Sequence, residues 1–492
     1  MVQPSTQASN AVIFVTYSLF LLMGLGMAYR YRHDLKGGFL SAIPVALNFI
    51  ASGLGSSVLF AYPELATITG VQGVIVYALS SSLPLLIFAA LGSIIRRKTP
   101  EGFVLTEWTR QRYGTAAMLY LSAATLFTLF LYLTAELSAI GQVVTTLTGV
   151  NQLPVMLVQV AVTTIYTSLG GFKISFVTDN IQGGMVICLI VIAAATIGAL
   201  TDIDTSLIRE SEFLKPTLLG WQLLYILPVC ILTNNFFLSN YWLRAFASKT
   251  DKDLWIGVSL ATTVILCVLV LVGMTGCIAV WSGALPLDEV ATSGSVAFFI
   301  LLDRLPSWVI GVVLVMVVTM SCSAFDTLQS AMVSSASNDL FRNRLNIWWI
   351  RAGILLIIIP AIVIALEAPS VLQIYLISDL VSACIVPRIL FIAGGFDDAR
   401  LLLPGWVSIA TALTLCYHIT QRKINIRKET STSINIFSIA SFVSMVALLA
   451  HLHTSRLDYP DAPLLHIVRA CRQYWAQMVG ENDGDLDAKC EL

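Results

Sequence analysis

Three acidic residues lie within long stretches of sequence that otherwise carry no charge. Glu136 is the only charged residue in segment 114–171, and Asp326 is the only one in segment 305–338. Asp179 directly precedes a further uncharged stretch. A carboxylate in apolar surroundings must bind a cation, take up a proton or be matched by polar partners, because its bare charge is costly there. These positions therefore predict cation binding or proton transfer.

Asp326 belongs to a row of oxygen-bearing side chains at three- and four-residue steps, which places them on one face of a helix. The row consists of Ser323, Asp326, Thr327, Ser330, Ser334 and Ser337. Oxygen ligands suit a hard cation, so Ser323, Asp326 and Thr327 predict an ion site. Small polar residues can instead let helices pack closely, and this alternative is favoured for the serines beyond Ser330.

A third feature is the run SGLGSS at residues 52–57, which interrupts an otherwise apolar helix. Glycine weakens a helix, and unwound backbone at membrane depth is tolerated only where it lines a cavity. Freed carbonyls beside two half-helix ends form cation and substrate sites in transporters, although glycines also serve tight packing. Two further acids, Asp379 and Glu64, have apolar neighbours. Asp379 fits a structural role as well as a functional one. Glu64 lies near the expected outer face, within reach of solvent.

The composition is that of a membrane protein. Hydrophobic residues make up 57% of the 492-residue chain and charged residues 12%, against about 25% charged residues in soluble domains. The net charge of -1 argues against a nucleic-acid partner. The nine cysteines lie mostly in apolar runs at no metal-ligand spacing, which indicates buried core residues. The first apolar stretch, residues 10–29, lacks a basic leader and a cleavage site and predicts a retained helix.

Stretches of about 20 apolar residues predict membrane-spanning helices. Thirteen are expected, near residues 10–29, 40–68, 71–95, 116–147, 152–170, 174–201, 219–243, 254–282, 307–338, 346–366, 370–392, 403–418 and 434–452. Lysine and arginine gather in every second loop, which puts these loops in the cytoplasm and the amino terminus outside. The alternation fails at QRKINIRK (421–428). Either one of the last apolar segments does not span, or a helix near 393–403 is missing; the second alternative is favoured.

Several motifs together resemble those of the sodium/solute symporter family. They are Tyr166-Thr167…Gly170-Gly171…Thr178-Asp179…Gln182, Ser323-Ala324-Phe325-Asp326 and SNYWLRAFASKTDKD (239–253). They occur in the family's order, and the resemblance covers about residues 38–392. Within the family, PEGFVLTEW (100–108), SAFDTLQSAM (323–332) and YLISDLVSA (375–383) look most like the fungal urea and polyamine active transporters.

The resemblance implies an all-α polytopic membrane protein whose fold consists of two inverted five-helix repeats. The expected divisions are 1–39, an amino-terminal helix and cytoplasmic loop; 40–201 and 219–392, the two repeats; 393–453, atypical carboxy-terminal helices; and 454–492, a polar tail.

The resemblance also implies two cation sites. At the first, the backbone carbonyls of Ala51 and Leu54 and the hydroxyl of Ser323 would hold a sodium-type ion. The family usually offers a second hydroxyl there, and in this chain that position is Ala324, which weakens the case for sodium.

At the second, more cytoplasmic site, Asp179 would act with Asp326 and Thr327. Two nearby carboxylates repel, which favours sharing a proton or a cation. The expected coupling ion is therefore Na⁺ or H⁺.

The implied substrate site lies at the interrupted helix. Glu136 stands near the central pocket, where the family often has a glutamine, and Ser52, Ser56 and Ser57 would face the substrate. An acid at this place suits a cation such as a polyamine or a hydrogen-bond donor such as urea.

The predicted function is a cation-coupled symporter that imports a small nitrogenous solute, urea or a polyamine, across the plasma membrane by alternating access. Its expected partners are the lipid bilayer and the solute, with no cofactor besides the coupling ion. A transporter-like nutrient sensor that binds without turnover is an alternative favoured by Ala324 and the unusual carboxy terminus. A passive channel is disfavoured as a function, because a channel does not require buried acids on facing helices. An enzyme is disfavoured because no nucleophile arrangement, phosphate loop or metal motif occurs.

Overall fold

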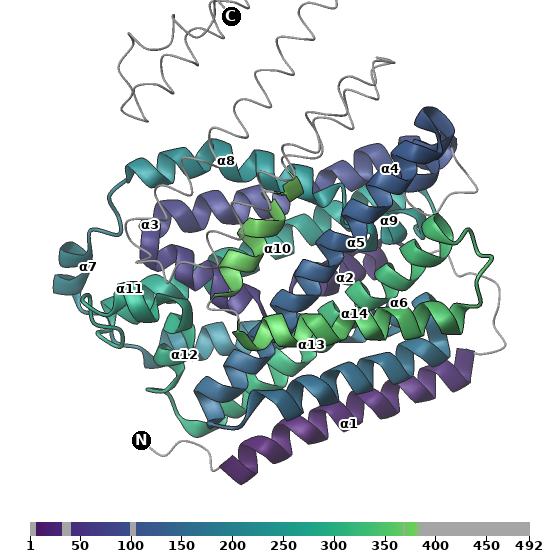
Figure 1. Cartoon of the computed structure of the whole chain (residues 1–492). Coiled ribbons are helices and arrows are strands. Elements are labelled where there is room, and N and C mark those ends of the chain that lie inside the picture. Colours follow the sequence, from purple (N-terminus) through teal and green to yellow (C-terminus); the bar gives the residue numbers. More distant parts are fainter. Residues whose placement is uncertain (1–5, 32–40, 99–104, 368–369, 380, 383–492) are drawn as a thin grey trace, which may run out of the picture. The chain divides into compact units, whose positions relative to one another are not determined.

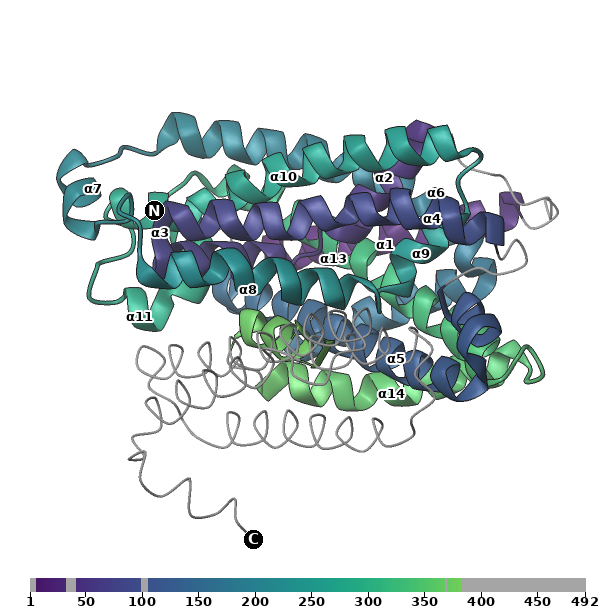
Figure 2. The ribbon, with the colours of Figure 1, turned by 90° about the horizontal axis from the view of Figure 1, so that it is seen from above.

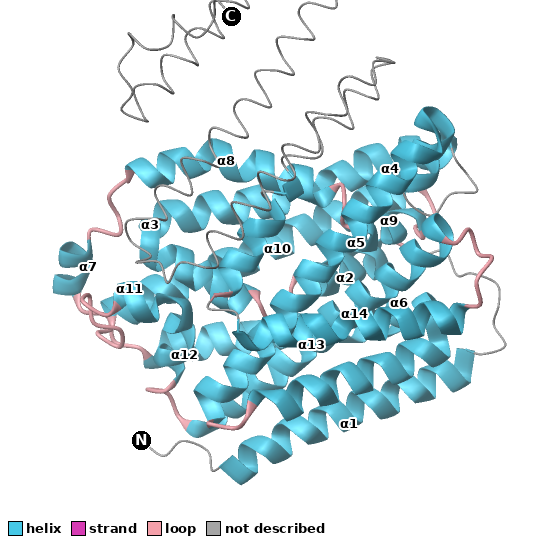
Figure 3. Ribbon diagram, in the orientation of Figure 1, coloured by secondary structure: helices cyan, strands magenta, loops and turns pink. Residues whose placement is uncertain are grey.

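The structure, a computed structural model, describes residues 6–31, 41–98, 105–367, 370–379 and 381–382. Within these ranges the chain forms helices and connecting loops and contains no strand (Figure 1, Figure 3). Nine helical stretches in these ranges are long and apolar enough to cross a membrane. The all-α membrane architecture expected from the sequence is confirmed.

The helices are numbered along the chain. They are α1 (Thr6–Tyr31), α2 (Ala42–Gly53), α3 (Val58–Ser82), α4 (Leu86–Lys98), α5 (Leu105–Thr148), α6 (Gln152–Leu200), α7 (Thr205–Ser211), α8 (Leu218–Asn235), α9 (Ser239–Phe246), α10 (Asp251–Trp281), α11 (Val290–Ser293), α12 (Ala297–Leu302), α13 (Ser307–Ser335) and α14 (Ile347–Glu367). Three tighter or wider turns, η1 (Leu83–Leu85), η2 (Gly294–Val296) and η3 (Ala336–Leu340), join some of them.

Most predicted spans correspond to these helices, and one prediction is wrong. The span 219–243 is not a single helix, because α8 ends at Asn235 and α9 begins at Ser239. Asparagine is a weak helix former, and the side chain of Asn234 donates to Tyr132 and Asp379. α6 is one continuous helix that contains two predicted spans, which correspond to its candidate membrane spans Gln152–Leu169 and Ile174–Leu200.

The predictions for the carboxy-terminal part concern residues that the structure does not describe. The predicted spans 403–418 and 434–452, the end of span 370–392 and the divisions 393–453 and 454–492 lie outside the described residues. The boundaries of the two repeats, 40–201 and 219–392, stay predictions.

Two glycines bend the long helices α3 and α5. Gly70 has a φ of 66° and Gly114 a φ of 86°, in a region that residues with a side chain rarely adopt. Directly after the bend in α3, the backbone N–H of Val71 donates to the carbonyl of Phe213 at 3.0 Å. The bend separates the spans that the sequence predicts at 40–68 and 71–95.

α13 is surrounded by other helices along most of its length, with α6, α5 and α1 packed against it (Figure 2). Its residues Phe325 and Asp326 have no exposed surface. α10 packs along α3 and α2. The polar face of α13 is thereby enclosed, with the end of α2 and the middle of α6 beside it.

α10 approaches α3 closely at Gly276. A Cβ atom at this position would lie 2.3 Å from the carbonyl oxygen of Pro63 and 2.9 Å from the Cβ of Ala66. The backbone of α3 cannot give way as a flexible side chain would. Only glycine fits this contact without displacing one of the two helices.

We expect Gly276→Ala to lower the thermal unfolding midpoint of the purified protein, because overpacking a close contact costs about 1–3 kcal/mol. Gly311→Ala in α13 is the matched control, since nothing lies within 4 Å of a Cβ at that position and alanine is the better helix former. Equal midpoints for the two variants would contradict the close contact.

Candidate functional site

The predicted interruption of the first apolar helix after residue 40 is confirmed. α2 ends at Gly53 and α3 begins at Val58, so Leu54–Ser57 leave the helix between two half-helices. Leu54 is fully buried. A Cβ on Gly55 would lie 2.0 Å from Oε1 of Glu136. Glycine at this position therefore lets the carboxylate of α5 approach the broken backbone.

Glu136 caps the first turn of α3. Its Oε2 accepts from the backbone N–H and from the hydroxyl of Ser56, each at 2.9 Å. Its Oε1 accepts from the hydroxyl of Ser57 and lies 3.4 Å from the hydroxyl of Tyr375. A negative charge at a helix start also complements the helix dipole. The hydrogen bonds of Glu136 are thus supplied by Ser56 and Ser57, and they hold the start of α3 in place.

Asp179 on α6 forms a fully buried ion pair with Arg244 on α9. The guanidinium Nη2 donates to Oδ2 of Asp179 at 2.5 Å and to Oγ1 of Thr327 at 2.8 Å, and both charged side chains are 0% exposed. Nε of Arg244 donates to the carbonyl of Asn48 at 3.1 Å, and Nη1 donates to the carbonyl of Asn240 at 2.8 Å. The pair therefore joins α6 and α9 to α2 and α13.

This role of Arg244 was not predicted from the sequence, where the residue is one of several basic residues in an expected cytoplasmic loop. Every residue of α9 is buried. The signal was present in SNYWLRAF, where Arg244 stands among large apolar side chains that a solvated loop would not carry. A buried acid such as Asp179 also calls for a positive partner.

Asp326 lies beside this ion pair and forms one polar cluster with Asp179, Arg244 and Thr327. Its own hydrogen-bond donors are neutral. It accepts from the hydroxyls of Tyr166 at 2.6 Å and Ser175 at 2.8 Å, both on α6, with Thr178 at 3.4 Å. Oγ1 of Thr327 lies 3.4 Å from one oxygen of Asp326 and 3.4 Å from Oδ2 of Asp179. With both acids ionised, the two carboxylates and the one guanidinium leave the cluster with one net negative charge.

The first predicted cation site adjoins this cluster. The hydroxyl of Ser323 donates to the carbonyl of Ala51 at 3.1 Å and lies 3.3 Å from Oδ1 of Asp179. The structure thus brings the α2 end, α13 and α6 together at these atoms. Ser52 is half-buried, and its hydroxyl has no hydrogen-bond partner among the described residues.

A cavity of about 100 Å³ lies beside the break, with Gly53 and Val58 in its wall. Five tyrosines line it: Tyr62, Tyr77, Tyr132, Tyr241 and Tyr375. Two pairs of these rings are in contact, with centroids 4.4 Å and 4.8 Å apart. Asp379 also lines the cavity, with one oxygen accepting from Asn234 at 2.7 Å. The predicted substrate residues are not among the lining residues; Glu136 and Ser57 touch the cavity through Tyr375.

The chain is similar to named fungal transporters and shares its fold with a solved symporter. The spermidine transporter DUR31 of Candida albicans is 48% identical over 394 residues, which are 79% of this chain and 75% of that protein. The urea active transporter of Saccharomyces cerevisiae is 25% identical over 233 residues, 43% of this chain and 31% of that protein. A Na⁺-coupled sialic acid symporter in an outward-open state aligns with a TM-score of 0.63 at 14% identity, over 82% of this chain and 96% of that chain. No protein-family model matches the chain.

The interrupted helix and this shared fold are those of the inverted five-helix repeat class. The relatives named transporters identify the chain as a membrane transporter and not an enzyme. The chain belongs to the sodium/solute symporter family, among the fungal urea and polyamine active transporters.

We expect Arg244→Gln to destabilise the protein strongly, because removing one partner of a buried ion pair leaves an uncompensated charge at a cost of about 3–5 kcal/mol. The double variant Arg244→Gln/Asp179→Asn should recover part of the loss, since it also removes the unpaired carboxylate. Thermal unfolding midpoints of the purified proteins measure both effects.

Arg97→Gln is the control for this cycle. Arg97 pairs with Asp251, but its side chain is 76% exposed, so its loss should cost less than about 1 kcal/mol. If the unfolding midpoint of the double variant is no higher than that of Arg244→Gln, the ion pair does not stabilise the fold in the way described.

Proposed function

We propose that this protein imports a polyamine, with spermidine as the best candidate, across the plasma membrane by symport with one monovalent cation. The observation that carries the proposal is the cavity beside the broken helix, with its five tyrosines and one buried carboxylate. The relative that is 48% identical is named a spermidine transporter, which supports the same substrate class.

The lining of the cavity suits an amine cation. Tyrosine faces attract an ammonium group through the ring quadrupole, by about 2 kcal/mol or more where water is excluded. Asp379 is 3% exposed, and its carboxylate supplies a charge-assisted hydrogen bond to the same group. At about 100 Å³ the cavity is smaller than the 300–1,000 Å³ that is typical for drug-sized ligands. It has the size for one amine end of a polyamine or for a very small solute.

Urea is the second candidate, favoured by a different side chain of the same cavity. Asn235 lines it, and its amide Nδ2 is buried with no hydrogen-bond partner among the described residues. This group fits the carbonyl oxygen of a neutral amide such as urea. Relatives from Schizosaccharomyces pombe and Saccharomyces cerevisiae are named urea active transporters.

The coupling cation would bind at the Asp179–Asp326 cluster. A fully buried group of charges with one net negative charge is costly in an apolar protein, and one bound Na⁺ or H⁺ neutralises it. The carbonyl of Ala51, the hydroxyl of Ser323 and the carboxylate of Asp179 would offer oxygens to a sodium ion. The carbonyl of Leu54 and the hydroxyl of Thr327 are further candidate ligands. Asp326, held by neutral hydroxyls, is the natural proton acceptor.

Binding at this cluster would alter the contacts of Arg244. A cation beside Asp179 competes with the guanidinium for the carboxylate, and the pair joins helices of both predicted repeats. Cation binding would thereby shift the equilibrium between the outward- and inward-facing states. The relatives are named transporters, which does not support the nutrient-sensor alternative, and uptake against a gradient distinguishes the two functions.

The function is tested by uptake of labelled spermidine and urea into cells lacking their own carriers, with external pH and sodium varied separately. We expect spermidine to accumulate above its outside concentration, and the accumulation to collapse when the coupling cation is withdrawn. Asp179→Asn and Asp326→Asn should abolish accumulation because each removes the negative charge that the cation neutralises. Asp204→Asn is the control, since Asp204 is an exposed helix cap. A surface-expressed protein that accumulates neither solute would refute the proposal.

Substrate recognition is tested by Asp379→Asn, which keeps an oxygen for the Asn234 amide but loses the charge. We expect the KM for spermidine to rise about ten- to a hundredfold, as for loss of a charge-assisted hydrogen bond of about 1.5–3 kcal/mol, while uptake of urea changes less. Glu64→Gln is the control, because Glu64 is a half-buried acid that accepts from Ser370 and lies outside the cavity. An unchanged KM for spermidine would exclude Asp379 from its binding.

A further inference from the structure

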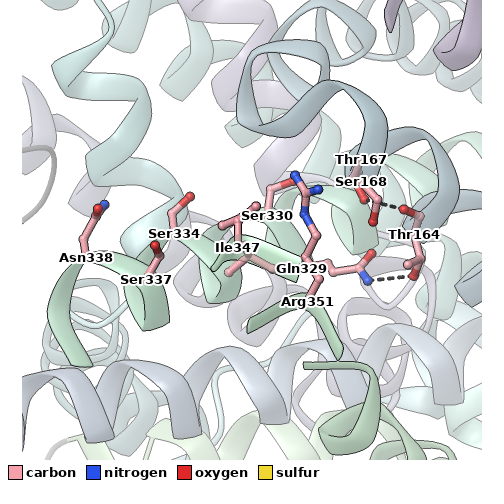
Figure 4. Close-up of a pocket in the computed structure, with 11 residues that line it drawn as sticks. Thr164, Thr167, Ser168, Gln329, Ser330, Ser334, Ser337, Asn338, Ile347 and Arg351 are labelled. Atoms are coloured by element: carbon pink, nitrogen blue, oxygen red, sulfur yellow. Dashed lines mark hydrogen bonds between the residues drawn. The ribbon is translucent and has the colours of Figure 1, made fainter. Parts of the chain in front are cut away.

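A second cavity lies at the other end of the polar face of α13, where it meets α6 and the start of α14 (Figure 4). Its volume is about 230 Å³. Ser330, Ser334 and Ser337 are among its lining residues. The sequence favoured close helix packing for the serines beyond Ser330; in the structure Ser334 and Ser337 face this cavity instead.

The cavity is lined by polar groups, two of which lack partners. The hydroxyl of Ser330 and the Oε1 of Gln329 are buried and make no hydrogen bond among the described residues, and these side chains are only 6% and 4% exposed. The amide Nε2 of Gln329 donates to Thr164 at 2.7 Å (Figure 4). A buried polar atom without a partner costs free energy unless water or a ligand satisfies it, so the cavity suits a polar occupant.

Among the described residues that line this cavity, Arg351 is the only one with a charged side chain. In Figure 4 its guanidinium reaches between Ser330 on α13 and the Thr167–Ser168 pair on α6. It lies over the ring of Trp348, 4.8 Å from the centroid, and has no carboxylate partner among the described residues. A guanidinium surrounded by hydroxyl and amide groups selects an anion and disfavours the polyamine substrate.

We propose that this cavity binds a phosphate group, presented by an anionic phospholipid headgroup or by a free phosphate ion. Arginine recognises phosphate through two parallel hydrogen bonds, and phosphate has more acceptor oxygens for the surrounding hydroxyls than a carboxylate has.

The surroundings of the cavity place it at the level of lipid headgroups. By the pattern of basic loops, this end of α13 faces the cytoplasm, where anionic lipids give the membrane a negative surface potential. Trp348 and Trp349, at the start of α14, are 58% and 71% exposed, as is typical of aromatic residues at a membrane interface. Arg342 and Arg344 in the preceding loop are exposed and add positive charge.

Occupation of the cavity would connect α14 to the helix that carries the cation cluster. Gln329 and Ser330 follow Asp326 and Thr327 by one helical turn on α13. A phosphate bound between Arg351 and Ser330 would therefore stabilise this packing of α6, α13 and α14.

The full-length protein, purified in detergent, is titrated with dioctanoyl phosphatidic acid, inorganic phosphate and dioctanoyl phosphatidylcholine. Binding is followed by the thermal unfolding midpoint and by native mass spectrometry. We expect phosphatidic acid to bind and to raise the midpoint, and Arg351→Gln to weaken that binding about ten- to a hundredfold, as for loss of a charge-assisted hydrogen bond. Arg344→Gln, which removes an exposed charge outside the cavity, should weaken binding far less than Arg351→Gln does.

Ser334→Val, which fills the cavity and keeps Arg351, provides a second variant and should also weaken binding. Binding of phosphatidic acid alone identifies a lipid headgroup as the ligand, and binding of inorganic phosphate at comparable concentration identifies free phosphate. The proposal is overturned if neither probe binds, if phosphatidylcholine binds as well as phosphatidic acid, or if Arg351→Gln binds as the wild type does.

Discussion

The buried ion pair between Asp179 and Arg244 is the interaction on which the rest of this structure depends. Both side chains are fully buried, and charges without water must have their hydrogen bonds supplied by the protein. Arg244 meets this requirement with the carbonyl of Asn48 and the hydroxyl of Thr327. Four helices, α2, α6, α9 and α13, are consequently fixed to one another at a single point.

The same requirement explains why this point is suited to coupling. With Asp179 and Asp326 both ionised, the cluster would carry one net negative charge, so a small cation would change its electrostatic balance more than a neutral ligand would. The break between α2 and α3 adjoins it, because the carbonyl of Ala51 accepts from Ser323. On the other side of the break, Glu136 holds the start of α3. The two half-helices are thus anchored to different polar centres.

The anchoring of the half-helices relates the Asp179–Asp326 cluster to the tyrosine-lined cavity. Tyr375 contributes to the cavity wall and contacts Ser57 and Glu136, while Gly53 and Val58 border the cavity at the ends of α2 and α3. A displacement of either half-helix would therefore change the cavity and the ion cluster together. α13 extends this connection to the polar cavity at its far end. Ion coupling, substrate binding and occupation of that cavity would all act through the packing of one helix.

The sequence by itself determined the class of the protein and the positions of its polar centres. Long apolar stretches predict membrane helices because bilayer thickness sets their length, and isolated acids such as Asp179 and Asp326 are conspicuous because each is costly there. The glycines at 53 and 55 likewise predicted the break between α2 and α3. These are local signals, and each depends only on neighbouring residues.

Only the tertiary structure decided which groups meet. Arg244 lies 65 residues from Asp179, and in the sequence it looks like one more basic residue of a cytoplasmic loop. Asp379 and the five tyrosines come from several parts of the chain and form one wall only after folding. Glu136, predicted to face the substrate, instead accepts hydrogen bonds from Ser56 and Ser57. The physical reason is that a charge or an aromatic ring has the same local signature whatever its partner is. The partner is chosen by helix packing, which brings together residues that no spacing along the chain relates.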